Sequence, residues 1–208
     1  MPQIVDYGMG NIRSLTNALI AIGLSVKIAK NPEDLEDAQP IILPGVGHFG
    51  TAMENMKANG MDARIIEKAG LGSPVLGICL GMQLLLESSD EACGIPGLGL
   101  IPGKAEKISP GNGRKVPHCQ WNRADLVSLT ACSETAPTEQ FYFMHSYSVM
   151  PIQRNHIWMT SDYLGHSIVA AIKNDVVSGV QFHPEKSGDS GLNFFNRYFE
   201  ELKSEHGL

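Results

Sequence analysis

Residues 73–87, Ser-Pro-Val-Leu-Gly-Ile-Cys-Leu-Gly-Met-Gln-Leu-Leu-Leu-Glu, constrain the fold of this chain more than any other stretch. The apolar run from Pro74 to Ile78 predicts a short buried parallel strand. From Leu80 onward, leucines recur at helical spacing, which predicts a helix up to Glu87. The chain must therefore pass from a strand into a helix within one or two residues.

Cys79 lies at this turn, with a glycine two residues before it and a glycine two residues after it. Gly77 and Gly81 lack Cβ atoms, so the strand and the helix can pass close to each other. The pattern is typical of a nucleophile elbow, here with cysteine where many hydrolases carry serine. Unpaired N–H groups at a helix start favour a thiolate on Cys79, and the N–H of Leu80 would face a forming oxyanion. A small buried cysteine in an ordinary strand–helix turn is the alternative.

The rest of the first ninety residues alternates strand and helix patterns. Strands are predicted at 3–7, 25–29 and 40–43, helices at 12–22 and 51–68, and an acidic connector of helical character at 32–37. Such alternation implies a parallel sheet with right-handed crossovers.

The second half has a different character. A loop at 94–103 precedes β-type runs at 115–121, 141–149, 156–161, 167–173 and 176–182, and a closing helix is predicted at 190–204. Asn174-Asp175 fits a hairpin turn between the last two runs. We therefore expect an α/β fold with a mostly parallel sheet flanked by helices and an antiparallel strand extension in the second half.

Size and composition favour one globular domain over residues 1–208. With 43% hydrophobic residues and a formal net charge of −6, the chain lacks the basic balance of nucleic-acid-binding proteins. Among Cys79, Cys93, Cys119 and Cys132 there is no Cys-x-x-Cys pair, so no zinc pattern is present. We expect a cytosolic protein with reduced thiols, without signal peptide, membrane span, metal or cofactor.

Two glycine-rich turns follow predicted strands. Residues 44–50 contain three glycines and can present backbone N–H groups to a ligand at the sheet edge where ligands bind, although an ordinary loop is the alternative. The Gly8-Met9-Gly10 turn lacks the third glycine of a dinucleotide fingerprint, because Arg13 stands there. It is interpreted as a polar turn that presents Asn11 and Arg13.

A nucleophilic cysteine needs a general base and a group that orients the base. His183 ends a strand-type run, and Glu185 follows two residues later. In an extended segment these side chains would point the same way, so Glu185 could fix the imidazole while its other nitrogen faces the thiol. A surface strand end is the alternative, and a zinc site lacks a third ligand. His145 is interpreted as a core or pocket-wall histidine, and His118 is ambiguous.

Six motifs in order resemble the class I, triad-type glutamine amidotransferases over essentially the whole chain. The family motifs are Pro-Gly-Val-Gly (44–47), Gly-Ile-Cys-Leu-Gly-Met-Gln (77–83) and Gln-Phe-His-Pro-Glu-Lys-Ser (181–187). Asp-Tyr-Gly-Met-Gly-Asn (6–11), Lys-Val-Pro-His (115–118) with Trp121-Asn122, and Tyr-Phe-Met-His-Ser-Tyr (142–147) are similar to the glutaminase subunits of imidazole glycerol phosphate synthases.

The resemblance implies a Cys-His-Glu triad that hydrolyses glutamine to glutamate and ammonia. Cys79 would attack the side-chain amide, His183 would take the thiol proton and later protonate the ammonia, and Glu185 would hold His183. The implied oxyanion hole comprises Leu80, Val46 and Gly47. The implied substrate-binding residues are Gln83, Glu91, Ser146 and Tyr147, and a glutamine one helical turn after the nucleophile suits amide recognition.

The resemblance also implies a heterodimer. The family passes its ammonia to a (β/α)8-barrel cyclase subunit, which makes imidazole glycerol phosphate in histidine biosynthesis. The partner-facing positions would be Asn11, Trp121, Asn122 and Lys186. A core aromatic is the alternative for Trp121, but an exposed tryptophan is a common interface anchor. Glutaminase activity would be low without the partner.

One departure from the family pattern lies near this interface. Cys119-Gln120 stands where the family has Met-Gly, and Gln120 adds a side chain where glycine allows close approach. An amidotransferase that supplies ammonia for amidino-sugar synthesis in surface polysaccharides is therefore an alternative. A cysteine peptidase or other hydrolase and a non-catalytic binding module are further alternatives, disfavoured by the His-Pro-Glu motif with Gln83 and by the intact triad.

Overall fold

The computed structural model describes residues 1–111, 113–127 and 139–206, so Cys132 lies outside the described residues. Its largest sheet consists of β1 (Gln3–Val5), β2 (Lys27–Ala29), β3 (Ile41–Leu43), β4 (Val75–Ile78), β8 (Asp125–Leu126), β11 (Ile157–Asp162), β12 (Ser167–Asn174) and β13 (Val177–Val180). The strand order is β2-β1-β3-β4-β13-β12-β11-β8. The first five strands in this order are parallel, and the last three are antiparallel. The expected fold class is confirmed.

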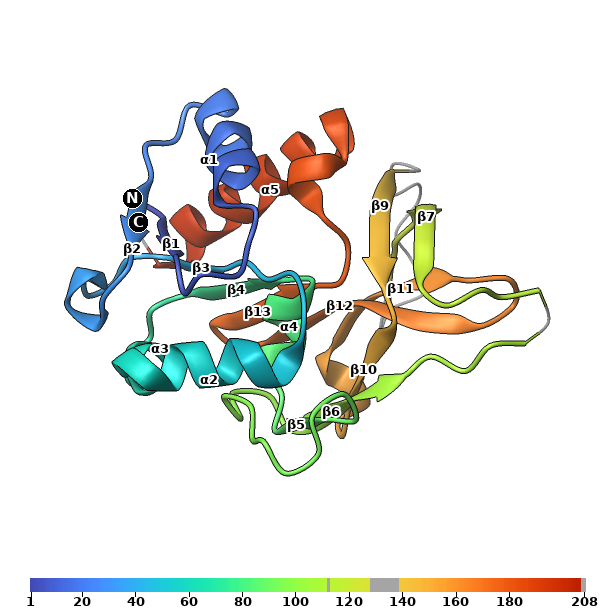
Figure 1. The fold of residues 1–208 in the computed structure, drawn as a ribbon. Helices are drawn as coiled ribbons and strands as arrows, with labels where there is room; N and C mark the ends of the chain where they lie inside the picture. The colour runs from blue at the N-terminus through green and yellow to red at the C-terminus, as the bar shows by residue number, and fades with distance from the viewer. Residues whose placement is uncertain (112, 128–138, 207–208) are drawn as a thin grey trace.

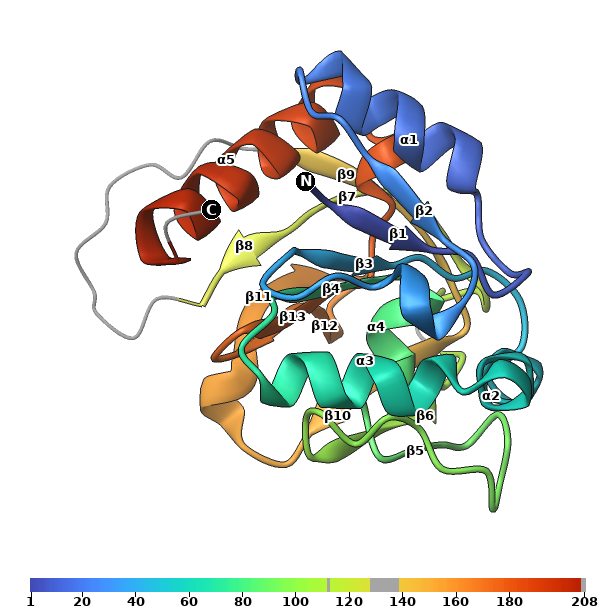
Figure 2. The ribbon, with the colours of Figure 1, turned by 90° about the vertical axis from the view of Figure 1, so that its left-hand side faces the viewer.

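Helices cover both faces of this sheet. Figure 1 shows α1 (Ile12–Ala21) and α5 (Gly188–His206) on one face, and α2 (Phe49–Asn59) and α3 (Met61–Gly70) on the other. Figure 2 shows the same layers from the side. Successive residues of the strands enter different clusters: Ile42 packs with the α1–α5 cluster, whereas Ile41 and Leu43 pack with the α2–α3 cluster. Burial on both faces explains why these strands are continuous apolar runs.

Two small sheets lie beside the large one. One contains β5 (Ser88–Ser89), β6 (Gly103–Lys107) and β10 (Tyr147–Pro151), and the other pairs β7 (His118–Arg123) with β9 (Gln140–His145). Short 3-10 helices occur at η1 (Pro32–Asp34), η2 (Arg154–His156) and η3 (Pro184–Lys186). The prediction of one strand over 141–149 was wrong, because the chain leaves β9 at Ser146 and joins another sheet as β10.

The single helix predicted over 51–68 was also wrong. Gly60 adopts a φ of +78°, ends α2 and begins α3. A left-handed glycine is a common helix end, and apolar residues at helical spacing on both sides concealed the break. The helix after Cys79 is α4 (Leu80–Leu84), which is shorter than the predicted one because the chain turns into β5. In the described part of the chain, no helix is long and apolar enough to cross a membrane.

Candidate active site

Cys79 lies at the carboxyl end of β4, immediately before α4, with backbone angles φ 55° and ψ −109°. A positive φ is unfavourable for a residue with a Cβ, so this turn is strained. The flanking glycines make it possible: a Cβ on Gly81 would lie 1.8 Å from the carbonyl oxygen of Leu43, and one on Gly77 would lie 2.6 Å from the backbone of Gly81. The structure therefore contains the elbow that the sequence predicted.

His183 reaches Cys79 because β13 is the parallel neighbour of β4. Ile78 pairs with Val180, and the N–H of Cys79 donates to the carbonyl of Val180 at 2.7 Å. The carboxyl ends of both strands therefore meet at one edge of the sheet. Cys79 and His183 line the same cavity, whose volume is about 220 Å³. The seven residues expected at the oxyanion hole and around the substrate line it as well: Val46, Gly47, Leu80, Gln83, Glu91, Ser146 and Tyr147.

His183 and Glu185 form a buried pair. The Nδ1 atom of His183 lies 2.8 Å from Oε1 of Glu185, and the two side chains are 2% and 5% exposed. The extended segment expected here was wrong, because residues Pro184–Lys186 form η3. The turn still brings the carboxylate back to the ring. Among the described residues, Nε2 of His183 has no hydrogen-bond partner.

The surroundings of His183 favour its protonated form. Burial alone lowers the pKa of His183, but Cys79 and then Glu185 outweigh burial and raise this pKa to about 10. An imidazolium beside a cysteine stabilises the thiolate, which is the nucleophilic form.

Two polar groups contact the sulfur of Cys79, and further polar side chains lie next to them. The Nε2 atom of Gln181 lies 3.7 Å from Sγ, and the carbonyl of Met144 lies 3.8 Å from it. Gln83 donates to Oε1 of Gln181 at 3.3 Å. Glu91 accepts from the N–H of Phe49 at 2.7 Å. Sequence reasoning did not single out Gln181, although it lies within the quoted Gln-Phe-His-Pro-Glu motif.

The expected partner-facing residues lie on more than one element. The side chain of Trp121 on β7 is 49% exposed, and its ring lies 6.0 Å from that of Tyr142 on β9. The Nζ atom of Lys186 lies 6.0 Å from the centre of the Tyr142 ring. The structure thus groups Trp121 and Lys186 around Tyr142, which the sequence did not indicate. Asn11 caps α1 and lines a small cavity with His183 and Glu185.

Gln120 and Asn122 lie on the other face of β7 from Trp121, because side chains alternate along a strand. The amide of Gln120 donates to Oδ1 of Asn122 at 2.6 Å, and Asn122 donates to the carbonyl of Asp162 at 2.8 Å. The departure at Gln120 therefore does not add a side chain to the face that carries Trp121.

His145, expected in the core or at a pocket wall, lies at the wall of the cavity and forms a buried pair with His118, whose role the sequence left ambiguous. Nδ1 of His118 lies 2.9 Å from Nε2 of His145, and Nδ1 of His145 lies 2.8 Å from the carbonyl oxygen of Tyr147. The ring of His118 stacks between Phe143 and Tyr163 at 5.0 and 4.1 Å. Burial lowers the pKa of His118 to about 4 and is the largest cause that lowers the pKa of His145 to about 3.

These shifts predict a loss of stability in acid. Unfolded histidines titrate near pH 6.5, so between pH 6.5 and pH 4 the unfolded state binds more protons than the folded state. The free energy of unfolding therefore decreases as the pH is lowered. At pH 5 the decrease is about 2 kcal/mol per buried histidine. Urea unfolding measures the free energy of unfolding at pH 7 and at pH 5. Between these two pH values it should decrease by about 2 kcal/mol less in His118→Phe than in the unmodified protein. His166→Gln changes an exposed histidine and should lose as much stability between pH 7 and pH 5 as the unmodified protein. If His118→Phe also lost as much stability as the unmodified protein, the prediction would be contradicted.

In the described part of the chain, no group of three or more histidine, cysteine, aspartate or glutamate side chains could hold a metal ion. The site combines a cysteine at a strained turn, a histidine–glutamate pair and backbone N–H groups around one cavity. This equipment suits acyl transfer from a small amide or ester.

Comparisons with known proteins agree with this chemistry. The family "Glutamine amidotransferase class-I" matches residues 3–201. A relative from Methanothermobacter thermautotrophicus, "Imidazole glycerol phosphate synthase subunit HisH", is 43% identical over 98% of this chain and 100% of its own length. The Bacillus subtilis protein of the same name is 39% identical over 95% of each chain. "Imidazole glycerol phosphate synthase hisHF, chloroplastic" from Arabidopsis thaliana is 39% identical over 94% of this chain and 33% of its own length.

Solved structures support the fold independently. A glutamine amidotransferase crystal structure superposes with a TM-score of 0.76 at 20% identity, covering 98% of both chains. The structure of PurLQS from Thermotoga maritima gives 0.74 at 22% identity, covering 97% of this chain and 98% of that one. With the family match over nearly the whole chain and relatives near 40% identity, this chain belongs to the class I glutamine amidotransferases, among the HisH subunits of imidazole glycerol phosphate synthase.

Proposed function

We propose that this chain is a single glutaminase domain, residues 1–208, that hydrolyses glutamine with Cys79, His183 and Glu185. The observation that carries the proposal is the arrangement of these residues. Cys79 lies at a strained elbow and shares one cavity with His183, whose Nδ1 atom is held by the buried carboxylate of Glu185. Glu185 fixes Nδ1 of His183, so Nε2 is left to exchange protons with the thiol and the substrate.

The reaction proceeds in two steps. The sulfur of Cys79 bonds to the amide carbon of the glutamine side chain, and the thiol proton passes through His183 to the amide nitrogen, which leaves as ammonia. Water, deprotonated by His183, then attacks the thioester carbon, and the carbon–sulfur bond breaks to give glutamate and the thiol. The proton that the thiol gives to ammonia in the first step is replaced in the second step by the proton that His183 takes from water.

An oxyanion forms in both steps, and backbone N–H groups beside the cavity can stabilise it. Those of Val46 and Gly47 donate no hydrogen bond within the residues that the structure describes, and both residues line the cavity. The N–H of Leu80 follows the nucleophile directly. Gln83, Glu91, Ser146 and Tyr147 surround the space that remains for the rest of the substrate.

We further propose that the ammonia passes to a (β/α)8-barrel cyclase subunit that makes imidazole glycerol phosphate in histidine biosynthesis, in the cytoplasm. The relative named hisHF supports a joint assembly, because only 33% of its length matches this chain and the rest is additional protein. None of the relatives named above is an amidino-sugar enzyme, a peptidase or a non-catalytic protein.

The test is glutamate release by the purified chain, measured alone and with a purified histidine-pathway cyclase and its ribonucleotide substrate. We expect slow hydrolysis alone, strong stimulation by the cyclase, and imidazole glycerol phosphate as product. Hydrolysis that ignores the cyclase would remove the histidine-pathway assignment and favour the amidino-sugar alternative. No hydrolysis under either condition would overturn the glutaminase proposal itself.

Trp121→Ala is expected to weaken cyclase binding by about 2 kcal/mol, a roughly 30-fold rise in Kd, because exposed tryptophans commonly anchor interfaces. Titration calorimetry measures the Kd directly. Hydrolysis by the isolated chain should be unchanged.

Ile152→Ala is the matched control for this prediction, since Ile152 is 72% exposed and follows β10 in another sheet. Its Kd should equal that of the unmodified chain. An unchanged Kd for Trp121→Ala would place the cyclase on a different surface.

A further inference from the structure

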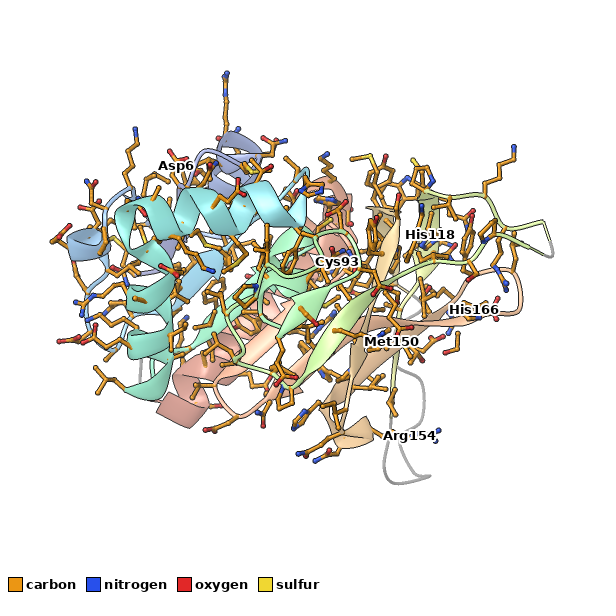
Figure 3. The ribbon with its side chains drawn as sticks, turned by 60° about the horizontal axis from the view of Figure 1, so that its bottom comes forward. Asp6, Cys93, His118, Met150, Arg154 and His166 are labelled. Carbon is orange, nitrogen blue, oxygen red and sulfur yellow. The ribbon has the colours of Figure 1, made fainter. Side chains whose placement is uncertain are left out.

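His118 does not touch Cys79, His183 or Glu185 in the contacts above, yet it is completely buried beside the cavity. It lies on β7, the strand that also carries the exposed Trp121. Figure 3 labels His118 among the side chains of this part of the molecule. Buried polar groups normally form hydrogen bonds, so the partners of the His118 ring indicate its role.

The tautomers of the two histidines follow from their partners. The carbonyl oxygen of Tyr147 can only accept, so Nδ1 of His145 carries the hydrogen of the 2.8 Å bond. A neutral imidazole has one N–H, and therefore Nε2 of His145 is an acceptor. His118 must then donate from Nδ1 across the 2.9 Å contact. Burial holds both rings neutral, as their lowered pKa values indicate.

A second set of hydrogen bonds connects the Tyr147 carbonyl with the nucleophile. The carbonyl oxygen of Tyr147 also accepts from Nε2 of Gln83 at 3.3 Å. This amide nitrogen donates to Oε1 of Gln181 at 3.3 Å, and Nε2 of Gln181 points its hydrogen at Sγ of Cys79 over 3.7 Å. Every donor between His118 and Cys79 thus meets an acceptor, and the Tyr147 carbonyl accepts from His145 on one side and from Gln83 on the other.

We propose that His118 is a positioning residue for the glutamine pocket. Its Nδ1–H fixes His145 in the tautomer that holds the Tyr147 carbonyl, and this carbonyl in turn orients Gln83 at the cavity wall. The inference rests on the proposed glutaminase function.

Without the His118 donor, the hydrogen of His145 can move to Nε2. The bare Nδ1 of His145 would then face the carbonyl oxygen of Tyr147, and two acceptors at that distance repel each other. The segment carrying Ser146 and Tyr147 would shift, and Gln83 would lose a fixed acceptor. These groups line the binding space, whereas the His183–Glu185 contact does not involve them. We therefore expect a rise in KM more than a fall in kcat.

Two substitutions separate this role from simple packing. In His118→Asn the amide nitrogen occupies nearly the position of Nδ1 and can still donate to His145, whereas in His118→Gln it occupies nearly the position of Nε2 and cannot. Both variants lose the ring that packs against Phe143 and Tyr163. We expect His118→Gln to raise KM for glutamine at least tenfold with kcat within threefold of the unmodified protein. We expect His118→Asn to keep KM within about threefold, which would be rescue by the donor alone.

The experiment measures glutamine hydrolysis by the full chain with its cyclase and, independently of activity, the tautomer of His145 by ¹⁵N–¹H NMR of the histidine rings. The expected NMR result is Nδ1–H on His145 in the unmodified protein. Equal KM values in the two variants would overturn the inference. A hydrogen on Nε2 of His145 in the unmodified protein would overturn it as well, and this NMR result is decisive even if His118→Gln fails to fold. An unmodified protein without glutaminase activity would overturn the proposed function instead, while the tautomer measurement still tests the hydrogen-bond network.

Discussion

Cys79→Ala is expected to lower kcat/KM for glutamine by at least about 10⁴-fold, because loss of the nucleophile removes the covalent route entirely. The fold should persist, since the hydrogen bonds of the sulfur with Gln181 and Met144 are long, at 3.7 Å and 3.8 Å. Alanine and cysteine also share the cost of the positive φ at this position. Glutamate release, with circular dichroism as a check of folding, measures the effect.

Cys93→Ala is the matched control, because Cys93 is exposed and its sulfur forms a long hydrogen bond, at 4.0 Å, with the carbonyl of Asp90. It should keep the activity of the unmodified protein. Ammonia supplied in the buffer should support the cyclase equally well with the Cys79→Ala chain bound. Retained glutamine hydrolysis in Cys79→Ala would sink the nucleophile assignment.

Gly81→Ala is expected to lower the free energy of unfolding by about 3–5 kcal/mol, because its Cβ has no space. This Cβ would lie 1.8 Å from the backbone carbonyl oxygen of Leu43, which is part of β3 and cannot swing away as a side chain could. β3 and α4 would have to separate, and the elbow that holds Cys79 would deform with them. Urea unfolding measures the free energy, and glutamine hydrolysis should fall in parallel.

Gly70→Ala provides the comparison at a glycine with open space. Gly70 ends α3, and a Cβ there has no neighbour within 4 Å. Alanine in a helix is favoured over glycine by about 0.5–1 kcal/mol, so Gly70→Ala should be neutral or slightly stabilising. If Gly81→Ala proved as stable as Gly70→Ala, the close packing of α4 on β3 would be wrong.

Local patterns predicted those features of the site that depend on one short stretch of chain. Glycines at 77 and 81 around a cysteine, after an apolar run, predicted the elbow, because only glycine permits the two elements to pass so closely. His183 and Glu185 were recognised as a pair from their spacing. The expected geometry between them was wrong, since a 3-10 turn and not an extended segment joins them. Spacing limits which side chains can meet, but several backbone paths satisfy the same limit.

Long-range pairing decided what spacing could not predict. The β-type run at 141–149 and the helical pattern at 51–68 were each predicted as one element, yet the first divides between two sheets and the second breaks at Gly60. The neighbours of Tyr142 and the His118–His145 bond also depend on β7 meeting β9 in one register. No local pattern encodes that register, because β7 and β9 are separated in the sequence and each strand by itself does not indicate which residue of the other it pairs with.

By itself, the sequence determined the α/β class, the strained cysteine turn and the histidine–glutamate pair, since each follows from local backbone preference and burial. Only the tertiary structure decided that β13 lies next to β4, which brings His183 to Cys79 from a distant part of the chain. It also decided which polar groups complete the cavity. Strand order is a choice among many pairings of similar apolar strands, and it is settled by how the whole core packs and not by any one segment.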